Sequence, residues 1–496
     1  MTPKATPDTL LFLVRVAPEV ATKARRTRRR FQQQLVRNLR DALAAAHIDC
    51  RIDARWSRML VEASDRAALK RMASVFGVSS VSEVEARLPA DLDEIVRTGE
   101  TLFADRVRDR KFAVRARRVG THPFTAQDVK VRLGAALDRH AASVDLSHPD
   151  VTVSVEVRDE EAFLFSGRER GAGGLPVGVE GQAVCLISGG FDSAVAAWLM
   201  LKRGIAVDYV FCNLSGEAYE RAVVSVAKIL ADEWSFGTRP RIHAVDFVPV
   251  VDALKATVQP KYWQVVLKRL MYRAAEAVAH DLRGEAIITG EAVGQVSSQT
   301  LGNLRAIDDV ASLPVFRPLL GLDKLEIIAL AERIGTAVLS AHVREYCAIL
   351  PDRPVTHAKP AAARDEESHV DLSLLQRAVA ERKVLDLRAL RDVDLVQPYL
   401  FASEIPEGAA VLDCREPHHF QHWHYPGAER RDIAELAAHF HRLDKTRTYV
   451  LYCAFGVQTA YVAEVMQREG YEAYSFKGGV RRLMQYAREQ GHPATV

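Results

Sequence analysis

The sequence predicts a multidomain α/β protein, and three observations support this fold class. The chain has 496 residues, more than one hydrophobic core usually serves. Between about residue 180 and residue 350, strand-like and helix-like segments alternate, as in a parallel sheet with helices on both faces. Separate strand and helix patterns also lie before this stretch and after residue 400. We therefore expect several α/β domains in one chain.

The composition predicts a globular protein, with 48% hydrophobic and 26% charged residues. The longest early apolar run, residues 9–14, ends at Arg15 and is too short to span a membrane. A secretory signal pattern is missing, so we expect a cytoplasmic location and no membrane partner. The six cysteines form no C-x-x-C pair, which disfavours zinc ribbons and iron–sulfur clusters, and no protein-held metal site is predicted.

The front part of the chain predicts two small α/β units. Residues 1–63 contain a strand at 10–16, a long basic helix at 21–46 and a strand at 52–61. Residues 64–168 contain strands at 111–117 and 151–157, and a helix that begins near Thr125 with Asp128 in a capping box. Basic clusters at 23–40 and 106–118 either neutralise nucleic-acid phosphates or lie on solvated helix faces.

Composition also predicts where the later domains begin and end. Glycine-rich residues 171–176 predict a hinge or linker, after which a third domain covers 177–360. Residues 361–400 are charged, have a helical pattern and are poor in aromatic side chains, and we interpret them as a linker to a last domain at 401–496.

The strongest local motif is an apolar strand that ends in Ser188-Gly189-Gly190-Phe191-Asp192-Ser193, directly before a helix at 194–202. Glycines let backbone N–H groups approach an anion, and the serine hydroxyls and the helix N-terminus add donors for a pyrophosphate. The motif lacks the lysine of a Walker loop. It resembles the PP-loop ATP pyrophosphatases, which adenylate a substrate. That resemblance implies ATP with Mg²⁺, an essential Asp192, and nucleotide contacts from Leu186, Ile187, Ser188, Gly189, Gly190 and Ser193.

Two later segments point to one particular family among the PP-loop ATP pyrophosphatases. Residues 290–301 and 317–324 resemble the signatures of the tRNA 4-thiouridine synthetase family, and the similarity extends over nearly the whole chain. It implies nucleotide contacts from Lys268, Gly290 and Gln299, and a catalytic role for Lys324. It also implies a ferredoxin-like first domain and a tRNA-binding THUMP second domain, to which residues 117–129 are similar. Within that segment we interpret His122 and Phe124 as structural.

The last domain resembles a rhodanese, on residues 411–416 and 424–428. Cys453 follows a strand and precedes a helix, where inward backbone N–H groups and the helix dipole stabilise a persulfide anion. Phe455 stands where the family often has a basic residue. The resemblance further implies that Cys347 forms a disulfide with Cys453 after sulfur delivery. Cys185 and Cys414 are interpreted as structural.

The resemblance to the tRNA 4-thiouridine synthetase family implies an ATP-dependent tRNA uracil 4-sulfurtransferase that makes 4-thiouridine at position 8. In this hypothesis uracil O4 is adenylated and Cys453 carries the persulfide sulfur. The expected partners are tRNA, a cysteine desulfurase and a thiol reductant. The resemblance also implies sulfur donation to the thiazole ring of thiamine, with a sulfur-carrier protein as partner. Two alternatives remain: an adenylating amide-forming ligase, and a non-catalytic tRNA-binding sulfur carrier.

Overall fold

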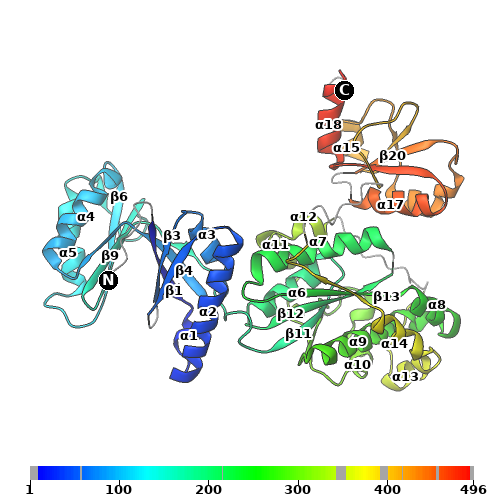
Figure 1. Ribbon diagram of the computed structural model, residues 1–496, viewed down its shortest axis with the longest axis horizontal. Helices are drawn as coiled ribbons and strands as arrows, with labels where there is room; N and C mark the ends of the chain where they lie inside the picture. Colours follow the sequence, from blue (N-terminus) through cyan, green and yellow to red (C-terminus); the bar gives the residue numbers. More distant parts are fainter. Residues whose placement is uncertain are drawn as a thin grey trace. The chain divides into compact units, whose positions relative to one another are not determined.

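The computed structural model describes residues 9–55, 58–214, 216–341, 353–390, 400–415, 417–453 and 457–491. The chain divides into two compact units (Figure 1). Unit 1 is Met1–Glu180 with Lys202–Gly204 and Phe236–Thr238, and unit 2 is the remainder. Within the described ranges, no helix is both long enough and apolar enough to cross a membrane.

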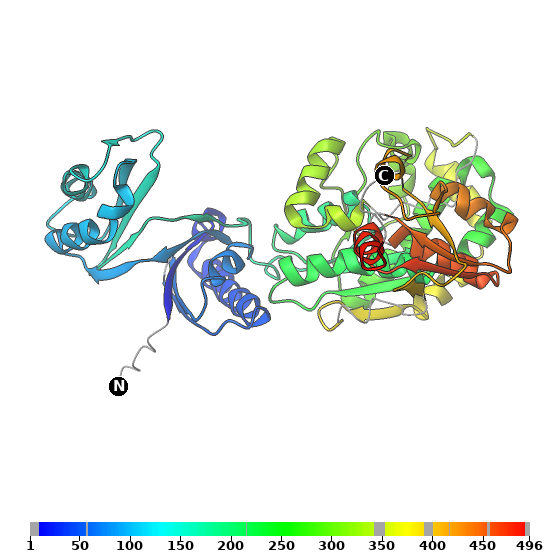
Figure 2. The same ribbon diagram turned by 90° about the horizontal axis from the view of Figure 1, so that it is seen from above.

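Unit 1 begins with an antiparallel sheet of strand order β10-β4-β1-β3-β2. Its strands are β1 (Leu10–Val16), β2 (Cys50–Ala54), β3 (Arg58–Ala63), β4 (Val78–Val84) and β10 (Glu169–Arg170), with helices α1 (Pro18–Ala21), α2 (Arg25–Ala45) and α3 (Ala68–Ala73). Phe31 and Leu35 of α2 share a core with Phe12 and Val14 of β1. Figure 2 shows α2 (blue) lying along these strands.

Three predictions for this region are corrected. The strand expected at 52–61 is two antiparallel strands, β2 and β3, and the Arg55 N–H donates to the Arg58 carbonyl (2.8 Å) at the end of their pairing. The limit at residue 63 excludes β4 and β10, which complete the same sheet. The expected hinge at 171–176 is packed instead: the Gly171 N–H donates to the Ser79 carbonyl (2.9 Å), and a Cβ there would collide with the Val78 backbone.

The second sheet of unit 1 has strand order β5-β9-β8-β6-β7. Its elements are β5 (Ala86–Pro89), α4 (Leu92–Val107), β6 (Lys111–Val119), α5 (Ala126–Asp138), β7 (Ser143–Val144), β8 (Val151–Arg158) and β9 (Glu161–Phe165). Thr125 caps α5, and its reciprocal hydrogen bonds with Asp128 form the predicted capping box. The predicted strands 111–117 and 151–157 are confirmed as β6 and β8.

A buried carboxylate ties the two sheets of unit 1 together. Glu156 of β8 accepts hydrogen bonds from Arg15 of β1 (3.2 Å), Arg58 of β3 (2.8 Å) and Arg158 (2.7 Å). Burial alone raises the pKa of Glu156, but the guanidinium charges outweigh it and lower the pKa to about 2.

Unit 2 contains the predicted parallel sheet, with strand order β15-β14-β11-β12-β13-β16. Its strands are β11 (Gln182–Leu186), β12 (Ala206–Asn213), β13 (Arg241–Asp246), β14 (Ile287–Ile288), β15 (Val315–Phe316) and the antiparallel edge strand β16 (Lys383–Asp386). Its helices are α6 (Phe191–Leu201), α7 (Glu217–Trp234), α8 (Val248–Thr257), η1 (Pro260–Tyr262), α9 (Trp263–Leu282), η2 (Ser297–Gln299), α10 (Leu301–Asp308), α11 (Lys324–Ile334), α12 (Ala337–Ser340), α13 (Pro360–Ser368) and α14 (Leu372–Ala380). The helices lie on both faces of the sheet, with α6, α7 and α11 on one face and α8, α9 and α14 on the other (Figure 1).

The predicted linker at 361–400 is also corrected. Val370, Leu375 and Val379 are buried in the same core as α8 and α9, and β16 extends the sheet by pairing with β13. Their apolar spacing gives α14 a face that packs on this core, so the charged residues of the segment cover its solvent side. The sheet domain therefore extends at least to Asp386.

The last sheet of unit 2 is parallel, with strand order β17-β21-β20-β18-β19. Its elements are β17 (Phe401–Ala402), β18 (Ala410–Asp413), α15 (Pro417–His422), β19 (Glu429–Arg430), α16 (Ile433–His439), η5 (Phe440–Arg442), β20 (Thr448–Tyr452), α17 (Val457–Arg468), β21 (Glu472–Phe476) and α18 (Gly479–Glu489). The side chains of alternate residues fill two cores, one on each face.

Candidate nucleotide and sulfur sites

The Ser-Gly-Gly-x-Asp-Ser motif forms a closed loop between β11 and α6. The Ser188 N–H donates to Ser193 Oγ (3.2 Å), and the Ser193 hydroxyl donates to the Gly190 carbonyl (3.3 Å). Gly189 has φ +79°, a left-handed conformation that favours glycine. Helix α6 begins at Phe191 and not at 194 as expected, so Asp192 lies in its first turn. The loop thereby presents backbone N–H groups and hydroxyls at a helix N-terminus, where anions bind.

Asp192 contacts the second predicted catalytic residue. Lys324 Nζ lies 2.9 and 3.0 Å from the two carboxylate oxygens of Asp192, and Gln295 Nε2 donates to that carboxylate (2.9 Å). Lys324 is the first residue of α11, which Asp323 caps through reciprocal hydrogen bonds with Glu326. Two motifs far apart in the sequence therefore meet at one carboxylate.

A cavity of about 510 Å³ lies beside the loop, at the carboxyl end of β11 and β14. Open α/β sheets bind their ligands at this end. The predicted residues that line it are Leu186, Ile187, Ser188, Asp192, Ser193, Lys268, Gly290 and Gln299. Gly189 and Gly190 belong to the adjoining loop and are not among the lining residues, and Lys324 reaches the cavity through Asp192. Apolar side chains of Val210, Phe211, Leu214 and Met271 also line the cavity.

Gly290 follows β14 and lies against the start of α6. A Cβ at this position would be 2.6 Å from the Asp192 carbonyl carbon and 2.6 Å from the Ser193 nitrogen. A side chain here would therefore displace the first turn of α6 or the end of β14. Gly290 is predicted from the sequence to contact the nucleotide, and the structure adds a packing requirement.

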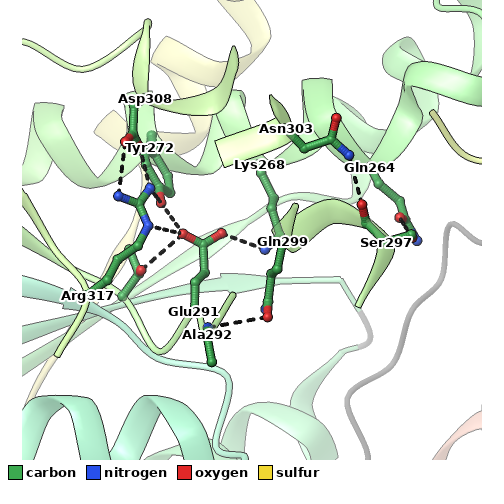
Figure 3. Close-up of polar contacts among 11 residues, drawn as sticks. Gln264, Lys268, Tyr272, Glu291, Ala292, Ser297, Gln299, Asn303, Asp308 and Arg317 are labelled. Atoms are coloured by element: carbon green, nitrogen blue, oxygen red, sulfur yellow. Dashed lines mark hydrogen bonds and ion pairs between the residues drawn. The ribbon is translucent and has the colours of Figure 1, made fainter. Parts of the chain in front are cut away.

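Glu291 holds a network that the sequence analysis did not assign (Figure 3). Its carboxylate accepts from Lys268 Nζ (2.6 Å), Tyr272 OH (2.5 Å), Thr289 Oγ1 (3.1 Å) and Arg317 Nε (2.9 Å). The side chain is buried, which alone raises the pKa of Glu291. The charges of Lys268 and Arg317 outweigh burial and lower that pKa to about 2. The carboxylate stays ionised and fixes the Lys268 ammonium at the cavity wall.

Gln299 lies in a segment that closes another side of the cavity. Its Oε1 accepts from the Ala292 N–H (3.3 Å), and Asn303 Nδ2 donates to the Ser297 carbonyl (2.8 Å). Ser297 Oγ in turn bonds Gln264 of α9 (3.0 Å) (Figure 3). These bonds hold η2 and the neighbouring chain over the cavity.

Cys453 follows β20 and its side chain is buried, with 2% of the residue exposed. Its Sγ lies 3.6 Å from Thr459 Oγ1, which bonds Ser475 Oγ (2.7 Å). A helix follows, as the sequence predicts, but this helix, α17, begins at Val457, before the expected end of the loop at Thr459. Cys347 and Phe455 lie outside the described residues.

In the two basic clusters of unit 1, some arginine side chains are exposed to solvent and others are buried. Arg25, Arg26, Arg29 and Arg37 of α2 are exposed, whereas Arg28 is buried. On β6, Arg115 and Arg117 are exposed. Phe124 is a core residue, as expected, and the His122 ring bonds the Asp159 carbonyl, a structural role.

Comparisons with known families match four successive segments of the chain. Residues 11–82 match the ThiI ferredoxin-like domain and residues 89–166 the THUMP domain. Residues 178–372 match the family described as thiamine biosynthesis protein (ThiI), and residues 398–485 match the rhodanese-like domain.

Curated relatives extend over almost the whole chain. A protein of Desulfurococcus amylolyticus named tRNA sulfurtransferase is 36% identical, covering 95% of this chain and 98% of the relative. One of the same name from Edwardsiella ictaluri is 36% identical over 93% of this chain and 98% of the relative. A crystal structure of a 4-thiouridine synthetase–RNA complex with bound ATP superimposes with TM-score 0.67 and 30% identity, covering 76% of this chain and 99% of that one.

Proposed function

The chain belongs to the tRNA sulfurtransferase family, and we propose that it makes 4-thiouridine at position 8 of tRNA in an ATP-dependent reaction. One observation carries the proposal: the phosphate-binding loop, Lys268, Gly290 and Gln299 surround a single cavity, with the Asp192–Lys324 pair at its edge. The solved 4-thiouridine synthetase with bound RNA and ATP supports the same assignment.

ATP fits this cavity chemically. The apolar side chains around Phe211 and Met271 suit an adenine ring, while the N–H groups and hydroxyls of the loop suit phosphate oxygens. Mg²⁺ typically takes one or two carboxylates together with phosphate oxygens. Asp192, in the first turn of α6 beside the phosphate-binding loop, is the carboxylate that would hold it, in exchange for its contacts with Lys324 and Gln295. When bound, the ion neutralises phosphate charge.

In the reaction, uracil O4 attacks the α-phosphate and pyrophosphate leaves. This converts a poor leaving oxygen at C4 into an AMP ester. Lys268 and Lys324 stand where they stabilise the negative charge that develops on the phosphates. Both ammonium groups are positioned in advance by carboxylates, Glu291 and Asp192.

Sulfur arrives as a persulfide on Cys453, loaded by a cysteine desulfurase. In one route the persulfide sulfur attacks C4, AMP leaves, and Cys347 attacks the Cys453 sulfur, which breaks the S–S bond and frees the thiolated base. In the other, Cys347 attacks the Cys453 sulfur first, and the sulfide that leaves attacks C4 and displaces AMP. Both routes leave a Cys347–Cys453 disulfide, which a thiol reductant reopens. The rhodanese-like match over residues 398–485 and the position of Cys453 between β20 and α17 support the carrier role. The exposed arginines of α2 and β6 are suited to tRNA phosphates, which report shape and not sequence.

Mass spectrometry of tRNA from cells that carry Cys453→Ser or Cys347→Ser tests the relay. Both variants should lose 4-thiouridine, whereas Cys50→Ser, at a half-buried cysteine of unit 1, should keep it. Normal 4-thiouridine in both relay variants would exclude the two-cysteine scheme. ATP–pyrophosphate exchange separates the alternatives: exchange without RNA indicates a ligase, and no exchange with tRNA indicates a carrier.

The description of the matched family also supports a role in thiamine biosynthesis. Persulfide on Cys453 would then pass to a sulfur-carrier protein of the thiazole pathway. Cells with Cys453→Ser should require added thiazole, and cells with Lys324→Met should not, because this transfer needs no adenylated uracil.

A further inference from the structure

Two cysteines of the last domain lie opposite each other on neighbouring strands. Strands β18 and β20 are parallel and pair Leu412 with Leu451 and Asp413 with Tyr452. The Cys414 N–H donates to the Tyr452 carbonyl (2.9 Å), so the ladder continues one residue beyond the strand. The next residues in this register are Cys414 and Cys453.

Both side chains lie on the same face of the sheet. Successive residues of a strand point to opposite faces. Leu412, Cys414, Leu451 and Cys453 share one buried core, whereas Val411, Val450 and Tyr452 belong to the core on the other face. The alternation thus directs both sulfurs into the same layer, beneath α16 and α17.

The separation of the two residues suits a disulfide. Neighbouring strands lie about 4.8 Å apart, and disulfides join Cα atoms about 4.4–6.8 Å apart. Both residues are thiols in the structure and both are buried, with 7% of Cys414 and 2% of Cys453 exposed. Burial, followed by the neighbouring Cys453, raises the pKa of the Cys414 thiol well above its ordinary value. Cys414 therefore stays protonated at rest and is itself a poor target for oxidants, and it must give up this proton to the departing oxygen when it attacks Cys453.

We propose that Cys414 is a resolving thiol for Cys453: it captures Cys453 as a reversible disulfide once a hydroperoxide has oxidised it. Hydrogen peroxide oxidises the Cys453 thiol to a sulfenic acid by two electrons and is reduced to water. Cys414 Sγ then attacks Cys453 Sγ, the S–O bond breaks, and the hydroxide leaves as water with the Cys414 proton. A dithiol reductant returns both thiols.

This reaction would protect the sulfur-carrying residue. A sulfenic acid with no neighbouring thiol is oxidised further to sulfinic and sulfonic acids, which thiols do not reduce. While the disulfide is present, Cys453 carries no persulfide, so the site is inactive and recoverable. The proposal stands apart from the Cys347 relay, because it requires only the register of β18 and β20.

The test uses the full chain with Cys347→Ser, so that the other predicted partner of Cys453 is removed. After exposure to hydrogen peroxide, digestion without reductant and mass spectrometry should find a peptide pair joined through Cys414 and Cys453. Dithiothreitol should separate the pair. Absence of this linked pair overturns the proposal, and the measurement needs no substitution at position 414.

A second arm adds Cys414→Ala or, as a matched control, Cys212→Ala at another buried strand cysteine. With Cys414→Ala, the fraction of Cys453 found as sulfinic or sulfonic acid after peroxide should rise at least fivefold. Cys212→Ala should leave that fraction unchanged. An equal fraction in the Cys414→Ala and Cys212→Ala proteins would also overturn the proposal.

Discussion

Glu291→Gln removes the charge that joins Lys268 to Arg317 while keeping the shape of the side chain. The pKa of Glu291 falls from 4.5 to about 2 in the folded protein. Because one pKa unit corresponds to about 1.4 kcal/mol, the charged form contributes about 3 kcal/mol. The pKa is depressed, so this contribution is complete above pH 4.5 and is lost as the pH falls toward 2. At pH 7 the substitution therefore removes all of it, and the half-buried Lys268 and the buried Arg317 are left without their shared partner.

Hydrogen-exchange mass spectrometry measures this loss of free energy in the peptides around Glu291. Peptides that cover β14 and α9 should open with about 3 kcal/mol less free energy at pH 7, which is about 100-fold faster exchange. Glu332→Gln, at an exposed position of α11, should leave these peptides unchanged. The binding constant for ATP should weaken in parallel, because Lys268 loses its fixed position. Exchange within twofold of the parent in the Glu291→Gln protein would refute the argument.

Three further predictions follow from the packing and charge of single residues. Gly290→Ala should abolish ATP binding by calorimetry, because the new Cβ meets the backbone of α6 at 2.6 Å, while Gly321→Ala, where a Cβ meets nothing within 4 Å, should bind normally. Lys324→Met should slow ATP–pyrophosphate exchange by about 100-fold with an unchanged melting temperature, since its side chain is 46% exposed and its role is electrostatic; exchange within threefold would contradict that role. Glu156→Gln should destabilise unit 1 by about 3 kcal/mol at neutral pH, with the difference shrinking as the pH falls from 4.5 toward 2, and urea unfolding at pH 7 and pH 3 checks both the size and the sign.

Local signals in the sequence predict much of the fold. The strand at 10–16, the capping box at Thr125 and the strand that leads to Cys453 are each encoded within a few residues, and each is confirmed. The wrong predictions concern elements whose place in the fold depends on contacts between residues far apart in the sequence. Strand β4 joins β1 across more than sixty residues, and α14 is recognised as core only by what it packs against.

The candidate site also has parts that the local sequence predicts and parts that only the fold reveals. The loop from Ser188 to Ser193 is contiguous, so its pattern is visible in the sequence. Glu291 could be quoted as part of a motif, yet its role depends on Lys268 from α9 and Arg317 from the chain after β15, which only the fold brings together. Cys414 is interpreted from the sequence as structural because it lies within a strand of the rhodanese-like segment. Its register with Cys453, thirty-nine residues away, is visible only in the fold.

After the second sheet of unit 1, the chain returns to the first sheet as β10, and this order affects both synthesis and truncated fragments of the protein. Four strands of the first sheet are complete by Val84, but the strand beside β4 emerges from the ribosome only with Glu169 and Arg170. The entire THUMP domain is made in between, so it must be released before the edge of the earlier sheet is covered. A fragment that ends at residue 84 would leave β4 unprotected and prone to pair with other chains, whereas one that continues through Gly171 would keep that edge covered.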